Sequence, residues 1–122
     1  MKPYERLLAW QASHRLVLGI YQATQRWPKP EQYGLMSQSR RAAFSIALNI
    51  AEGSARRGSR EFRRFLDIAL GSMSDLTYCL RLARELDYLG EAEWKEIEDQ
   101  REEAGKLLWG LYQAMSRAKR PT

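Results

Sequence analysis

Arginines gather in one short stretch of the chain, residues 53–64, between two segments with helical periodicity. They are Arg56, Arg57, Arg60, Arg63 and Arg64. A planar guanidinium matches phosphate oxygens, and free backbone N–H groups at a helix start add to the attraction for anions. At helical spacing Arg60 and Arg64 project away from the apolar side of their segment. The stretch is predicted to contact nucleic-acid phosphates. The alternative is an ordinary solvated surface, in which Arg63 and Arg64 pair with Asp67.

Two further arginines, Arg40 and Arg41, directly precede an uncharged stretch, residues 42–51. They are additional candidates for phosphate contact. An ion pair across a subunit interface is an equal alternative, with Glu52 or an acid on the fourth predicted helix, residues 92–117, as the partner.

The net charge supports an acidic partner without specifying it. The 122 residues carry +5 overall, from 20 Lys and Arg against 15 Asp and Glu. Residues 1–66 hold 12 basic and 4 acidic side chains, or +8, and the remainder holds 8 and 11, or −3. The first half of the chain is therefore the half expected to attract nucleic acid.

Residues that support catalysis are scarce. A single Cys excludes an intrachain disulfide, and a single His excludes a histidine-rich metal site. His14 lies in an apolar helical stripe and is predicted to be a core residue, as is Cys79. Carboxylate chemistry from Glu52 and Glu61 lacks a paired base or a metal scaffold. We expect no enzymatic activity, no metal and no cofactor.

Apolar residues recur with helical spacing along the whole chain. In the third quarter Phe62, Leu66 and Ala69 begin a stripe of alternating four- and three-residue steps. Prolines 28 and 30 end the first helix, and Ser59 is the expected N-cap of the third. The predicted helices cover residues 7–26, 34–56, 60–88 and 92–117. Because the connections are short, we expect one all-α domain over residues 1–122, an antiparallel up-down-up-down four-helix bundle.

The second of these helices is apolar on more than its core side. The additional apolar residues are Phe44, Ala47, Leu48 and Ala51. A helix that is apolar nearly all round must be covered from outside, so this face is predicted to be a subunit interface. A bland alanine-rich surface is the alternative. Asn49, a polar residue at the edge of the core face, is expected to cap, to bridge or to set helix register.

No stretch of the chain is long and apolar enough to span a bilayer. The longest uncharged stretches are residues 16–25 and 42–51, and the N-terminus has no apolar targeting region. A cytoplasmic protein without membrane contact is expected.

The block RRAAxSIxxNIAEG, residues 40–53, resembles the small four-helix-bundle proteins encoded within intervening sequences of bacterial 23S rRNA genes. The resemblance extends from about Leu8 to Met115. That family is similar to the accessory protein of diversity-generating retroelements, which associates with a reverse transcriptase and binds nucleic acid.

This resemblance implies a homopentameric barrel of antiparallel bundles with no established enzymatic activity. It also implies binding of RNA or DNA through a basic surface. Carried onto this chain, the block would make Arg40, Arg41, Asn49, Glu52 and Gly53 interface and fold-determining positions.

The sequence therefore predicts a non-enzymatic, oligomeric nucleic-acid-binding or ribonucleoprotein accessory protein. The competing hypothesis is a protein-interaction adaptor whose basic patch docks an acidic partner, such as a reverse transcriptase.

Overall fold

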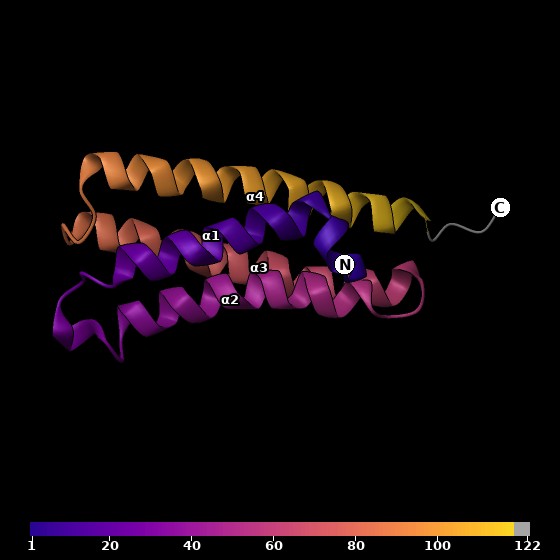
Figure 1. Cartoon of the computed structure of the whole chain (residues 1–122), viewed down its shortest axis with the longest axis horizontal. Coiled ribbons are helices and arrows are strands. Elements are labelled where there is room, and N and C mark those ends of the chain that lie inside the picture. The colour runs from indigo at the N-terminus through magenta and orange to yellow at the C-terminus, as the bar shows by residue number, and fades with distance from the viewer. Residues whose placement is uncertain (119–122) are drawn as a thin grey trace.

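The computed structural model describes residues 1–118, which form four long α-helices. They are α1 (Leu8–Thr24), α2 (Leu35–Ser54), α3 (Gly58–Glu85) and α4 (Glu91–Ala118), with short 3-10 helices η1 (Pro3–Arg6) and η2 (Lys29–Glu31). Helix α1 packs on α2 and α4, and α3 packs on the same two helices. Consecutive helices run in opposite directions (Figure 1). The prediction of an all-α antiparallel four-helix bundle is confirmed for the described residues.

The core lies between the apolar stripes of the four helices. Leu16, Ile50, Leu80 and Leu108 each have 0% of their surface exposed. Complete burial of one such side chain stabilises the fold by about 1.5–3 kcal/mol, so these stripes account for the bundle.

One charged residue interrupts the apolar stripe of α4. The Arg101 guanidinium donates to both carboxylate oxygens of Glu98, at 2.9 Å each, and both side chains are largely buried. The hydrogen bonds that Glu98 accepts raise the pKa of Arg101. A paired charge thus fills the position at which the stripe breaks.

At one end of the bundle, the α1–α2 connection is tied to the α3–α4 loop. Glu31 accepts the Leu35 N–H at 3.0 Å at the start of α2, and its other oxygen accepts the Tyr88 hydroxyl at 2.7 Å. The Leu35 and Tyr88 hydrogen bonds lower the pKa of Glu31, and the same carboxylate raises the pKa of Tyr88. Trp27 turns into the core beside Tyr88, with 4% of its surface exposed.

At the other end, α2 and α3 approach each other closely beside their turn. A Cβ on Gly53 would lie 2.7 Å from Phe62 Cδ1 and 2.9 Å from Phe65 Cβ. Helix α3 begins at Gly58, whose φ of +79° suits glycine. The prediction of Ser59 as the N-cap is wrong, because α3 starts two residues earlier than predicted and Arg57 is its N-cap.

Candidate nucleic-acid interface

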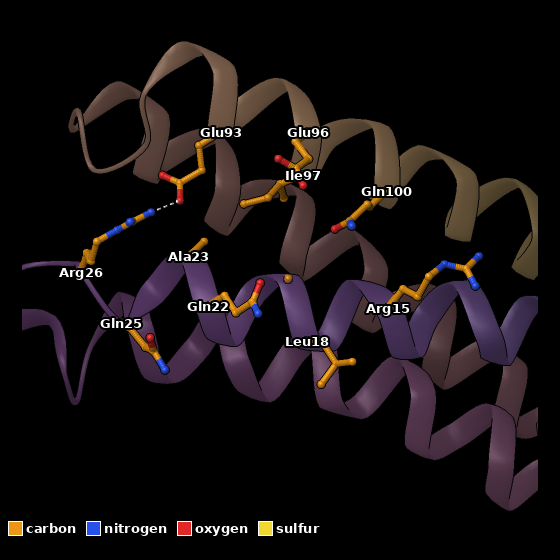
Figure 2. Close-up of a pocket in the computed structure, with 11 residues that line it drawn as sticks. Arg15, Leu18, Gln22, Ala23, Gln25, Arg26, Glu93, Glu96, Ile97 and Gln100 are labelled. Carbon is orange, nitrogen blue, oxygen red and sulfur yellow. Dashed lines mark hydrogen bonds and ion pairs between the residues drawn. The ribbon is translucent and has the colours of Figure 1, made fainter.

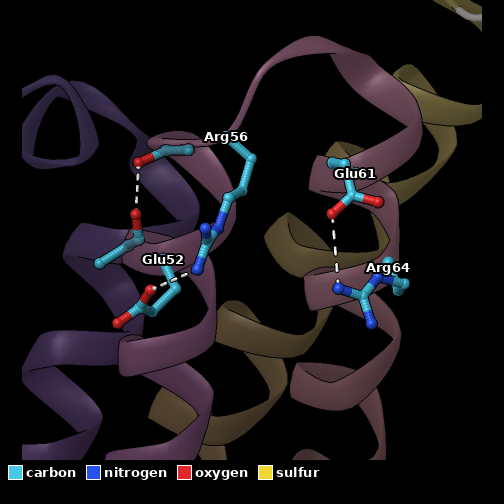
Figure 3. A network of polar contacts seen from close by, with 6 residues as sticks. Glu52, Arg56, Glu61 and Arg64 are labelled. Carbon is cyan, nitrogen blue, oxygen red and sulfur yellow. Dashed lines mark hydrogen bonds and ion pairs between the residues drawn. The ribbon is translucent and has the colours of Figure 1, made fainter.

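The α2–α3 turn, here taken as residues 53–64 from the end of α2 into the start of α3, carries two arginines that lie against the same aromatic ring. The guanidiniums of Arg56 and Arg64 lie 4.9 and 5.4 Å from the ring centroid of Phe65. Arg56 also pairs with Glu52 at 3.3 Å, and Arg64 pairs with Glu61 at 3.4 Å (Figure 3). Exposed cation–π contacts contribute about 0.5–1 kcal/mol each. The ring therefore holds two positive charges near each other at this end of the bundle.

The other three arginines of the turn have fewer partners within the chain. Within residues 1–118, Arg57, Arg60 and Arg63 make no ion pair. Arg57 and Arg60 are exposed, and Arg63 is half-buried. A hollow of about 420 Å³ is lined by Arg60, Arg63, Arg64, Glu61 and Asp67. Asp67 lines this hollow and pairs with neither Arg63 nor Arg64, so the ion pairs expected in the alternative of a solvated surface are not formed.

Charge and backbone geometry at the turn both favour an anion. Five arginines stand against Glu52, Glu61 and Asp67, which leaves two positive charges unbalanced. No side chain caps the N-terminus of α3, which begins beside Arg57. The positive end of the helix dipole thus adds to the arginine charges.

Arg40 has hydrogen-bond partners within its own chain. Its Nε donates to Thr24 Oγ1 at 2.8 Å, its Nη2 donates to the Tyr21 carbonyl at 3.2 Å, and its guanidinium lies 4.6 Å from the Tyr21 ring centroid. Thr24 is fully buried. Arg40 therefore ties α2 to the last turn of α1, and neither a phosphate nor a carboxylate of another subunit is needed to explain it.

Arg41, its neighbour, is exposed on the outer side of α2 and makes no ion pair with any described residue. It lies 15 residues before Arg56, or about 22 Å along the helix. The structure thus does not bring Arg41 to the α2–α3 turn.

The outer face of α2 is apolar but narrower than predicted. Phe44 is 52% exposed and Leu48 is 41% exposed, whereas Ala51 is half-buried. Ala47 is only 8% exposed and is covered within the chain. Phe44 and Leu48 are therefore the residues of this face that remain available to a partner.

Asn49 takes part in a polar chain between α2 and α3. Its Nδ2 donates to the Ser45 carbonyl at 2.8 Å and to Ser45 Oγ at 3.1 Å. The Ser45 and Ser72 hydroxyls are 2.7 Å apart and link the two helices. Asn49 thus acts through Ser45, and Ser72 is a participant that the sequence analysis did not identify.

Neither of the two residues considered for nucleophilic or base chemistry has a catalytic arrangement. His14 is exposed and stacks on Trp10 at 4.8 Å between ring centroids, so the prediction of a core histidine is wrong. Cys79 is buried, and burial raises the pKa of its thiol. Within residues 1–118, no three His, Cys, Asp or Glu side chains are grouped to hold a metal ion. In that same range no helix has the length and hydropathy to cross a membrane.

A second, larger hollow of about 640 Å³ lies between α1 and α4 (Figure 2). Its two arginines are both paired within the chain, Arg26 with Glu93 at 2.8 Å and Arg15 with Glu103 at 3.5 Å. Because these carboxylates neutralise the arginines, this hollow suits a phosphate less well than the turn does.

The fold and the site define a small all-α bundle with a basic surface at one end. The chain belongs to the 23S rRNA-intervening sequence protein family, which matches residues 5–110. This confirms the family suggested by the block at residues 40–53.

A solved structure has the same fold. It is the crystal structure of a protein of unknown function from the S23 ribosomal protein family of Bacteroides thetaiotaomicron VPI-5482. The TM-score is 0.78 at 21% identity, covering 87% of this chain and 96% of the other. No curated protein matches the chain.

Proposed function

We propose that this chain is a non-enzymatic nucleic-acid-binding protein, an accessory component of a ribonucleoprotein, that contacts phosphates through the α2–α3 turn. The observation that supports this most directly is the arginine cluster. Five arginines share one end of the bundle, and three of them make no ion pair within residues 1–118. The contacts would be made by Arg56, Arg57, Arg60, Arg63 and Arg64.

Self-association is the second part of the proposal. Phe44 and Leu48 are exposed on α2, as expected of an interaction surface. The family resemblance favours a homopentamer. Five copies of +5 would carry about +25, and linked phosphate contacts would add avidity. Light scattering of the purified protein measures the oligomer mass directly.

The proposal is tested by fluorescence anisotropy on protein stripped of nucleic acid, with a structured RNA and a duplex DNA across a salt series. The logarithm of the binding constant is expected to fall linearly with the logarithm of salt. The slope is about 0.9 for each duplex phosphate contacted. A flat salt dependence would contradict phosphate contact.

The double variant Arg60→Glu with Arg64→Glu localises the contact. It is expected to weaken binding and to reduce the salt slope by about 1–2, with no change in oligomer mass. The matched control is Arg81→Glu with Lys95→Glu, which changes net charge equally on exposed positions outside the turn. Equal affinity in both double variants would show that the turn has no special role. Failure of the unaltered protein to bind either ligand would favour the adaptor that docks an acidic protein, such as a reverse transcriptase.

A further inference from the structure

The outer surface of α4 carries an exposed aromatic pair. Trp109 is 51% exposed and stacks on Tyr112, with ring centroids 5.5 Å apart and planes 15° from parallel. Tyr112 is half-buried and packs against the hydrophobic core. Because Tyr112 is anchored and covers one face of the indole, it orients Trp109 and leaves the remaining indole surface open to solvent.

Both signs of charge occur near Trp109 on α4, where Lys106 shares a hollow with Asp99, Glu102 and Glu103. Lys106 and Arg117 are exposed and lie on the same outer side of α4, three residues before and eight residues after Trp109. The acidic residues of α4 all precede Lys106, and the part of α4 after residue 103 contains two basic and no acidic side chains. The charge of α4 therefore changes sign along the helix, and Trp109 lies in the positive part.

This part of α4 lies toward the end of the bundle that holds the α2–α3 turn (Figure 1). Arg81 of α3 and Glu98 of α4 line the same hollow. The two residues therefore lie at about the same height along the bundle, which sets the antiparallel register of α3 and α4. Arg63 precedes Arg81 on α3 by as many residues as Ser116 follows Glu98 on α4, and each interval is about 27 Å of helix. Arg63 and Ser116 therefore lie at the same height along the bundle. Trp109 lies about 10 Å along the bundle axis from the height of Arg63, on the side away from the turn.

We propose that Trp109, oriented by Tyr112, stacks on an unpaired nucleobase while Lys106 and Arg117 contact the adjoining phosphates. This rests on the proposed function and specifies its ligand, a nucleic acid with single-stranded nucleotides beside the segment that contacts the turn. An aromatic side chain flanked by cations is the arrangement that binds single strands without reading their sequence. A duplex cannot use it, because its bases are already stacked on one another.

A second copy of the chain fits this surface less well. Lys106, Gln113 and Arg117 surround Trp109 with polar and charged groups on the outer side of α4. The core of a subunit interface is depleted of charge, which describes the α2 face with Phe44 and Leu48 better. A closed ring pairs two different faces of each copy, so the oligomer mass of the Trp109→Ala variant decides whether this surface is the second face.

The test compares a short oligouridylate with an RNA duplex of the same length, again by anisotropy. Trp109→Ala is expected to weaken binding of the single strand by about fivefold or more and to leave duplex binding unchanged. Trp109→Phe is expected to keep most of the affinity because it keeps a ring. Leu18→Ala, which removes an equally exposed apolar side chain from α1, is the control and is expected to change neither.

The outcomes separate this site from the proposed function. If Trp109→Ala binds the single strand as tightly as the unaltered protein does, and also binds the duplex, the stacking site is overturned. The proposed contact at the turn would then stand. A change of oligomer mass in Trp109→Ala would reassign the residue to a subunit interface and overturn the site. If the unaltered protein binds neither RNA, the proposed function and this site fail together.

Discussion

The two ends of the bundle differ in how many of their charged residues have partners within the chain. At the end that holds η2, Glu31 is bonded to the Leu35 amide and the Tyr88 hydroxyl, and nearby Arg40 is bonded to Thr24. These charges bind parts of the chain to one another. At the α2–α3 turn, Arg57 and Arg60 are exposed and make no ion pair with residues 1–118.

The difference shows that the number of arginines in a segment does not identify a binding surface. What matters is whether the fold supplies each guanidinium with partners. Arg40 and Arg60 have the same chemistry, but only Arg40 lies within reach of a buried hydroxyl.

Gly53→Ala is expected to disturb the basic end most strongly. Its Cβ would come within 3.0 Å of Phe62 and Phe65, so α2 and α3 must separate. We expect the free energy of unfolding to fall by about 1–3 kcal/mol, as for other overpacked sites. Urea unfolding measures this. Nucleic-acid affinity should fall as well, because Phe65 supports Arg56.

The control for this variant is Gly71→Ala on α3. No atom lies within 4 Å of a Cβ there, and the helix should gain up to about 1 kcal/mol. Equal stability of the Gly53→Ala variant and the parent would contradict the close approach of the two helices.

Arg40→Ala is expected to affect the fold and not the ligand. Loss of the bonds to Thr24 and Tyr21 should lower the free energy of unfolding by about 1–2 kcal/mol. The folded variant should bind RNA with parental affinity. Arg41→Ala is the matched control, with a stability change within about 0.5 kcal/mol. The contrast between the two ends would be wrong if Arg40→Ala weakened RNA binding while unfolding like the parent.

Glu31→Gln is expected to change mainly the pH dependence of stability. The folded state lowers the pKa of Glu31 below its ordinary value of 4.5, so its contribution is complete above that value and is lost as pH falls through the lowered pKa. The raised pKa of Tyr88 acts at the other extreme, with a contribution lost only above its ordinary value of 10.0.

Urea unfolding at neutral and acidic pH tests this prediction. The parent should lose more stability on acidification than Glu31→Gln, which has no carboxylate to protonate at this position. Tyr88→Phe, which removes only the hydroxyl, should retain part of the acid dependence through the Leu35 bond. Identical acid profiles of the parent and Glu31→Gln would assign the acid loss to other carboxylates.

Some of the site follows from local sequence and some does not. The exposure of Arg60 and Arg64 follows from helical spacing against Leu66, a residue that is fully buried. The stacking of Arg56 on Phe65 does not, because Arg56 lies in the turn after α2 and Phe65 lies on α3. Trp109 carried a signal in its spacing from Lys106, but only the placement of α4 relates it to the turn.

The sequence by itself determined the class of fold, because apolar spacing and proline positions act within a few residues of the chain. It likewise determined where arginines are concentrated. Only the packing of α1 on α2 shows that Arg40 is bonded within the chain, because its partners Thr24 and Tyr21 lie on another helix. Tertiary structure also exposed His14, since the side of α1 that faces the core is set by how its neighbours pack and places Leu16 and Ile20 inside.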